Sequence, residues 1–176
     1  ESPNMLGLKA QLFALRARYE ESLLIADSML KRDPEDSSAL ATRAYDLLKL
    51  GRPQEALTAV NELLERGLEE MLPLAAAVHY QLAHFEPAAQ MARKAITKLD
   101  SDSLGNPRLG AVALTLVAAE ARLGHLSRAK SALADFNAAV PGVRTLSAIR
   151  KWVHPGADLA GYEPLFEGLR QAGVPD

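Results

Sequence analysis

The sequence contains no cysteine, which excludes disulfide bridges, thiolate metal sites and cysteine nucleophiles together. Aromatic residues are scarce as well, at 5% against 48% hydrophobic residues in total, so the core must be aliphatic and rich in alanine. Such a core suits closely packed helices, because strands favour aromatic and β-branched side chains. The sequence therefore predicts an all-α protein.

Long runs of one charge or of apolar residues are also missing. Twenty basic and 22 acidic residues give a net charge of −2 at pH 7, which argues against nucleic-acid binding and against a membrane-surface patch. The longest apolar candidate, Leu109 to Leu123, contains Glu120 and Arg122 and is shorter than the ~20 residues that a bilayer requires. We expect a cytoplasmic protein. Because the first residue is Glu rather than Met, we also expect it to be part of a longer chain.

Motifs for catalysis or metal binding are absent from the sequence. His79 and His84 are five residues apart and diverge around a helix, which makes them a poor pair of metal ligands. No phosphate-binding glycine loop and no nucleophile elbow occurs. The acidic pair Glu20-Glu21 lies at an expected helix start, where negative charge is favourable and solvated. We therefore predict a chain that is not an enzyme and holds no cofactor and no metal.

The clearest positive feature is a helical hairpin from Ala44 to Leu63. Apolar residues recur at helical spacing on both sides of a break at Gly51 to Pro53. Ala44 and Ala56 are small enough to let the two helix backbones approach closely. A single hairpin cannot bury its apolar face alone, so this pattern requires similar hairpins stacked beside it.

Copies of the hairpin recur with a period near 34 residues. A shift of 34 places Ala10 on Ala44, while the spacing is 32 from Ala56 to Ala88 and 41 from Ala88 to Ala129, across a polar insert. Hairpins are expected at about 4–34, 37–68, 71–100 and 108–141, which together form a repeat array over 1–143.

Two more helices are expected in the C-terminal segment, 144–176. They run from Thr145 to Val153 and from Glu163 to Ala172. The terminal repeat of an array exposes an apolar face that must be covered. We predict that these helices cap the array, with four apolar side chains as the covering groups: Trp152, Leu165, Phe166 and Leu169.

These hairpins resemble the tetratricopeptide (TPR) repeat. The family has a small residue midway along the first helix, a glycine-like turn, an alanine early in the second helix and a closing proline. The second copy matches at Ala44, Gly51 and Ala56, and the fourth at Gly124, Ala129 and Pro141. The first copy departs from the pattern at Ser22, and no copy has the common tryptophan. The resemblance implies a right-handed superhelix of about four hairpins with two capping helices.

In TPR proteins the first helix of each hairpin lines a concave groove that holds a peptide or a helix. The family's groove positions correspond here to Gln11, Leu15, Tyr45, Lys49 and Arg122, and to His79 or Tyr80 in the third hairpin. The carboxylate clamp of the chaperone-binding members is not preserved, since its positions hold Gly7, Gln11 and Thr42. The resemblance therefore implies a protein or peptide partner in the groove, and an upstream domain of the same chain would also qualify.

The tail carries a second resemblance. Phe166 to Pro175, FEGLRQAGVP, is similar to the end of bacterial signalling proteins in which a TPR array follows a class III adenylate or guanylate cyclase domain, or a winged-helix DNA-binding domain. The resemblance implies a C-terminal regulatory segment of a cyclase-like protein, acting through protein interaction. Three alternatives stay open: the interaction domain of a winged-helix regulator, a small-molecule sensor, and homo-oligomerisation through the exposed end of the array.

Overall fold

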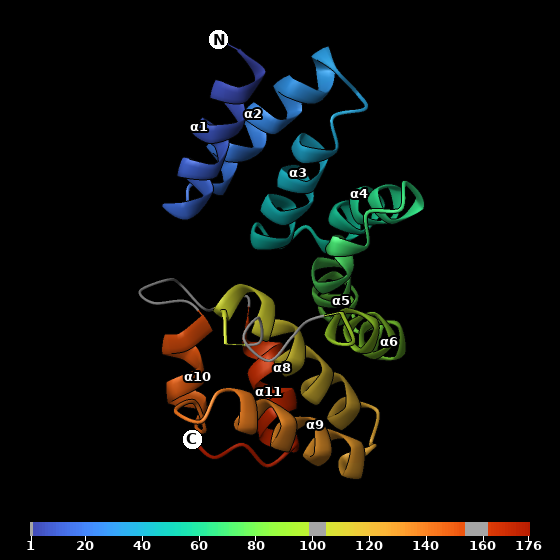
Figure 1. Cartoon of the computed structure of the whole chain (residues 1–176), viewed down its shortest axis with the longest axis vertical. Helices are drawn as coiled ribbons and strands as arrows, with labels where there is room; N and C mark the ends of the chain where they lie inside the picture. Colours follow the sequence, from blue (N-terminus) through green and yellow to red (C-terminus); the bar gives the residue numbers. More distant parts are fainter. Residues whose placement is uncertain (1, 99–104, 154–161) are drawn as a thin grey trace. The chain divides into compact units, whose positions relative to one another are not determined.

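The computed structural model describes residues 2–98, 105–153 and 162–176, and the polar insert lies largely outside these ranges. All regular elements in the described ranges are helical, which confirms the all-α prediction (Figure 1). They are α1 (Pro3–Leu15), α2 (Tyr19–Arg32), α3 (Ser37–Lys49), α4 (Pro53–Glu65), the short 3-10 helix η1 (Glu69–Met71), α5 (Leu72–Gln81), α6 (Phe85–Ile96), α8 (Pro107–Arg122), α9 (Leu126–Ala139), α10 (Leu146–Val153) and α11 (Glu163–Gln171). None of the described helices is long and apolar enough to cross a membrane.

Within the ranges that the structure describes, four helical hairpins follow one another along the chain. Each consists of two consecutive helices in contact: α1 with α2, α3 with α4, α5 with α6, and α8 with α9. Local sequence sets several of the helix ends. The Asp36 carboxylate accepts hydrogen bonds from the backbone N–H groups of Ser38 and Ala39 at the start of α3, and Pro53 occupies the first turn of α4.

Every hairpin turn contains one residue with left-handed backbone geometry. Gly51 and Gly124 have φ of 70° and 78°, while Ala17 and Ala83 hold the same region at 56° and 57°. The residue after each of them donates its N–H to a carbonyl five residues earlier, as His84 does to His79. The four turns therefore share one geometry, although only two of them contain the glycine that favours it.

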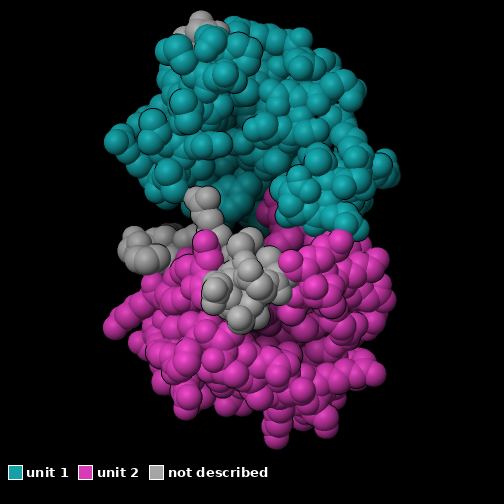
Figure 2. All heavy atoms as spheres, in the orientation of Figure 1, with its two compact units in different colours: residues 1–71 teal, residues 72–176 magenta. Residues whose placement is uncertain are grey.

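The chain divides into two compact units, residues 1–71 and residues 72–176 (Figure 2). This division falls between the second and third hairpins, and the boundary at 143/144 stays a prediction. In unit 1 the largest fully buried side chains are Leu47, Leu63 and Val60, packed among alanines. In unit 2, α10 and α11 share one core with α8 and α9.

The helix α11 packs against the last hairpin, as a capping helix would. Its principal contacts are with α8, the first helix of the fourth hairpin, and the two lie side by side in Figure 1. The Tyr80 hydroxyl of α5 donates a hydrogen bond to the backbone carbonyl of Pro164, at 2.9 Å. Phe166 and Leu169 are fully buried in this contact. The helix therefore covers α8 and Tyr80 of α5, because its apolar residues complete the core there.

The residues of the FEGLRQAGVP tail have packing roles. A Cβ placed on Gly168 would lie 2.7 Å from the Cβ of Ala118, so only glycine permits this approach of α11 to α8. Gly173 has φ of 95° and ends the helix, and the carbonyl of Pro175 accepts a hydrogen bond of 2.7 Å from the N–H of Leu146. The tail sequence thus specifies how the chain end docks on its own unit.

A buried carboxylate joins the last two hairpins. Glu120 on α8 is 1% exposed and forms an ion pair with Arg93 of α6, and its Oε2 lies 2.9 Å from Nδ1 of His125 at the start of α9. A charge removed from water is stable only when it is paired in this way. Glu120 therefore connects the third hairpin to the fourth.

Candidate functional site

An aromatic and cationic surface forms in unit 1 around Tyr45. Tyr45 lies on α3, and its ring meets that of Tyr19, on α2, edge to face with 6.3 Å between the centroids. Lys49, one helical turn along α3, places its Nζ 5.1 Å from the centre of the Tyr45 ring. The predicted groove residues Tyr45 and Lys49 therefore lie together, and Tyr19 extends the surface that they form.

The first hairpin adds a second pair to this surface. The guanidinium of Arg18 lies 4.4 Å from the centre of the Phe13 ring and also donates hydrogen bonds to Glu21. Arg18 and Tyr19 are consecutive in the chain, so the two pairs are neighbours in sequence. We call the set Phe13, Arg18, Tyr19, Tyr45 and Lys49 the aromatic–cationic surface.

A buried carboxyl group lies beneath this surface. Asp46 follows Tyr45 on α3, is 0% exposed, and its oxygens accept no hydrogen bond of ordinary geometry from the described residues. Burial raises its pKa to about 6, and the nearby Ser22 hydroxyl acts in the opposite direction. Burial, with a smaller contribution from the Asp46 charge, also raises the pKa of Tyr19. The aromatic–cationic surface thus rests on a polar group held in an apolar environment.

The two other predicted residues of unit 1, Gln11 and Leu15, lie on α1 with exposed side chains, Leu15 at 67%. Their positions make them accessible to a partner. Leu15 also belongs to an exposed apolar stripe on α1 that it forms with Met5, Leu8 and Leu12.

The predicted residues of unit 2 have different surroundings. Tyr80 is 4% exposed beneath α11, and burial raises its pKa to about 12, so it cannot line an accessible surface. His79 is half-buried with its ring 5.8 Å from that of His84, and burial lowers its pKa. Arg122 is exposed and stacks over Phe85 at 4.9 Å. Of the alternatives in the third hairpin, only His79 is accessible.

Sequence reasoning missed Phe13, Arg18 and Tyr19. The family's groove positions come from first helices, whereas Tyr19 opens a second helix and Arg18 lies in the turn before it. The useful signal was the scarcity of aromatic residues in the sequence, because Phe13, Tyr19 and Tyr45 all fall within the first two hairpins.

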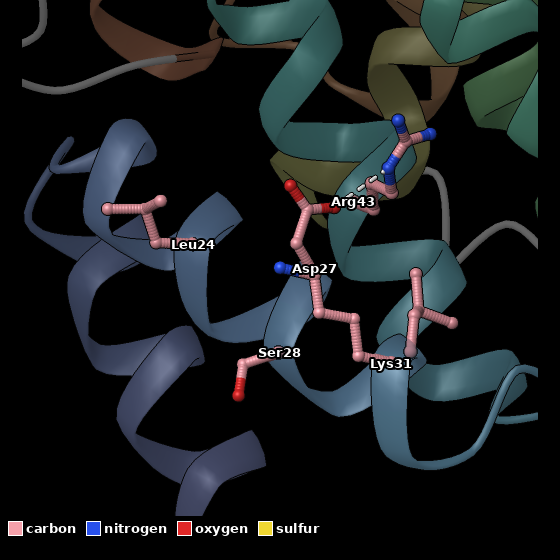
Figure 3. A pocket seen from close by; sticks show the side chains of 6 residues that line it. Leu24, Asp27, Ser28, Lys31 and Arg43 are labelled. Carbon is pink, nitrogen blue, oxygen red and sulfur yellow. Dashed lines mark hydrogen bonds and ion pairs between the residues drawn. The ribbon is translucent and has the colours of Figure 1, made fainter.

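A separate hollow of about 440 Å³ lies on another side of unit 1 (Figure 3). Its lining includes Leu24, Asp27 and Lys31, and Arg43 Nε donates a hydrogen bond of 2.9 Å to Asp27 Oδ1. Arg43 and Tyr45 are two residues apart on α3, so their side chains diverge by about 200°. The hollow is open to solvent and does not enclose a small molecule. Among the described residues, no three histidine or acidic side chains gather as a metal site.

The repeated hairpins, with one left-handed residue in each turn, define a TPR-like helical-repeat fold. A comparison with solved structures agrees: the crystal structure of YrrB, described as a TPR protein with an unusual peptide-binding site, superposes with a TM-score of 0.62 at 18% sequence identity. The match covers 93% of this chain and 80% of that chain. No protein-family model and no curated protein matches the sequence. At this identity the likeness establishes the fold.

Proposed function

We propose that this chain is a protein-interaction module that binds a peptide segment of a partner at the aromatic–cationic surface. The observation that carries the proposal is the clustering of Tyr19, Tyr45 and Lys49 on neighbouring helices of unit 1. In unit 2, α11 packs along α8 and covers Tyr80 of α5, which leaves His79 and Arg122 as the accessible positions there. The structural likeness to a protein described as having a peptide-binding site supports the same class of partner.

The chemistry of the surface favours an acidic peptide that carries an aromatic or aliphatic anchor. Flat tyrosine and phenylalanine rings provide contact area at a low cost in conformational entropy, and the adjoining Lys49 supplies a positive charge that attracts carboxylates. Gln11 and Leu15 on α1 would contact the same peptide further along, and His79 and Arg122 are the corresponding candidates in unit 2.

The tail resemblance supports a more specific context. The chain would be the C-terminal regulatory segment of a bacterial, cytoplasmic, cyclase-like signalling protein, itself without catalytic activity. Its partner would be another protein or the upstream domain of its own chain. Binding would then favour one arrangement of the output domain by differential contact. A winged-helix regulator is the alternative parent that the same tail supports.

The test is a selection of binders from a peptide display library on the full chain, followed by affinity measurement with the selected peptides. Tyr45→Ala should weaken binding by about 30-fold, as expected for a hot-spot aromatic, and Lys49→Glu by about 10-fold or more. Lys31→Glu, in the hollow that lies away from Tyr45, is the matched charge control and should leave affinity unchanged. Equal affinity for wild type and Tyr45→Ala would refute the proposal. Arg122→Glu then tests whether unit 2 contributes.

A further inference from the structure

Two histidine rings meet at the turn of the third hairpin. His79 lies in the last turn of α5, and His84 is the residue that immediately precedes α6. Their ring centres are 5.8 Å apart and the ring planes are inclined by 45°. The sequence spacing predicts that the rings diverge, because five residues of a continuous helix turn through about 500°. That prediction is wrong, since α5 ends at Gln81 and the chain has already turned when it reaches His84.

The backbone of this turn fixes the two histidines relative to each other. The N–H of His84 donates a hydrogen bond of 2.9 Å to the carbonyl of His79, and the carbonyl of His84 accepts the N–H of Ala88 at 3.0 Å. Ala83, between them, has the left-handed geometry of the other hairpin turns. Only the side-chain torsions are left to adjust when a ligand binds, so a small part of the binding free energy is lost to ordering.

Neither imidazole is used by the surrounding structure. The Nδ1 atom of His79 is buried and has no hydrogen-bond partner among the described residues. His84 is exposed, and its side chain makes no capping hydrogen bond at the start of α6. A buried polar atom without a partner is uncommon in folded proteins. This uncommitted ring nitrogen indicates that the pair has a ligand.

The electrostatics of the pair keep His79 neutral. Burial lowers its pKa, and the neighbouring His84 lowers it further. A neutral imidazole has a ring nitrogen with a free lone pair, which is the form that coordinates a metal ion. The site therefore offers a metal ligand at neutral pH without first releasing a proton from His79.

The separation of the rings fits two ligands of one ion. With metal–nitrogen bonds of ~2.0–2.1 Å, the centre of each ring lies about 3.2 Å from the ion, so two rings are about 5.2 Å apart at a tetrahedral angle and about 6.4 Å apart when opposite. The observed 5.8 Å lies between these limits. The two histidines can therefore share an ion without any movement of the backbone.

We propose that His79 and His84 form a two-histidine site for a divalent late transition-metal ion, with Cu²⁺ bound more tightly than Ni²⁺ or Zn²⁺. Imidazole suits these three metals, and their order follows the general trend of complex stability. Among the described residues no third histidine or acidic side chain joins the pair, so the other coordination positions remain open. Arg122, which stacks over Phe85 beside His84, adds a positive charge that limits the affinity.

The metal site does not rest on the proposed function. His79 is also a candidate peptide contact in unit 2, and the two roles are compatible. A metal with two protein ligands keeps open positions, to which a carboxylate of an acidic peptide can coordinate. The experiments below use the full chain without peptide, so their outcome is separate from that of the peptide selection.

Isothermal titration calorimetry with Cu²⁺, Ni²⁺ and Zn²⁺ near neutral pH tests the site. The chain should bind one ion, and His79→Gln and His84→Gln should each weaken binding by at least about 10-fold, because two linked ligands bind far more tightly than one. The double variant should bind no more weakly than the single variants. His125→Gln, which removes the histidine beside Glu120, should bind like wild type. Wild type that binds none of the three ions at millimolar concentration, or a wild-type affinity in His84→Gln, overturns the proposal.

Electron paramagnetic resonance of the Cu²⁺ complex tests the number of imidazole ligands. Wild type should show two coordinated imidazoles, and each single variant should show one. Because His84 is exposed, His84→Gln keeps this comparison valid even where His79→Gln alters the packing of α5. The ion should be released at about pH 5, since protons compete for the histidines. The same spectrum for wild type and His84→Gln, or an ion that stays bound at low pH, overturns the assignment.

Discussion

The buried carboxyl of Asp46 makes the stability of unit 1 depend on pH. Burial raises its pKa from 3.8 to about 6 in the folded chain. Between these two values the folded state therefore binds more protons than the unfolded state. The free energy of unfolding consequently falls as pH rises through this window: the stabilisation is fully present below about pH 4 and is lost above about pH 6.

The magnitude follows from the size of the shift. Each pKa unit corresponds to 1.36 kcal/mol, so a shift of about two units makes unit 1 less stable at pH 7.5 than at pH 4 by roughly 3 kcal/mol from this group alone. Asp46→Asn keeps the shape of the side chain and removes its charge. The variant should match wild type near pH 4 and exceed its stability by about 1–3 kcal/mol at pH 7.5, since the buried amide leaves some hydrogen-bonding groups unsatisfied.

Urea unfolding followed by circular dichroism between pH 4 and pH 7.5 measures this effect. Trp152 is the only tryptophan and belongs to unit 2, so its fluorescence provides a reference for that unit in the same samples. Glu65→Gln removes one exposed carboxylate from α4 and is the charge-matched control. If wild type and Asp46→Asn have parallel pH profiles, Asp46 is not the group responsible and the reasoning fails.

Three further substitutions test the packing. Gly168→Ala should destabilise unit 2 by about 1–3 kcal/mol in urea, because its Cβ would press on Ala118, whereas Gly142→Ala meets nothing within 4 Å and should have no effect. Glu120→Ala should lower the stability of unit 2 by about 2 kcal/mol or more, because Arg93 and His125 then lose the carboxylate that they contact. Tryptophan fluorescence measures this change. Ala83→Gly should stabilise the chain by about 0.5–1 kcal/mol in a thermal melt, because it relieves a left-handed alanine; an unchanged midpoint would contradict this.

The helices could be predicted from sequence because each depends on local signals. Gly51 to Pro53 break the periodicity of the second hairpin; α3 ends at Lys49, two residues before Gly51, and α4 begins at Pro53. Tyr80 shows where local signals fail. Its helical position suggested a groove-lining role, but Pro164 and α11, more than 80 residues away in sequence, cover it. Nothing in the spacing of α5 reports a contact with a segment so distant.

The polar core of unit 1 was hidden for a related reason. Asp46 occupies an ordinary helical position, and no periodicity distinguishes a buried aspartate from an exposed one. The signal lay on the neighbouring hairpin, where Ser22 stands at the position that the repeat reserves for alanine. The Ser22 hydroxyl lowers the pKa of Asp46 while burial raises it. The serine in place of alanine and the buried aspartate therefore belong to the same polar cluster.

The hairpin turns bear on how such arrays are detected. A left-handed backbone angle recurs at Ala17, Gly51, Ala83 and Gly124, yet the amino-acid type alternates. What the chain repeats at this point is a dihedral angle, and a profile that rewards glycine there would score two of the four hairpins poorly. Degenerate arrays of this kind are therefore better aligned on the spacing of their turn hydrogen bonds than on the identity of the turn residue.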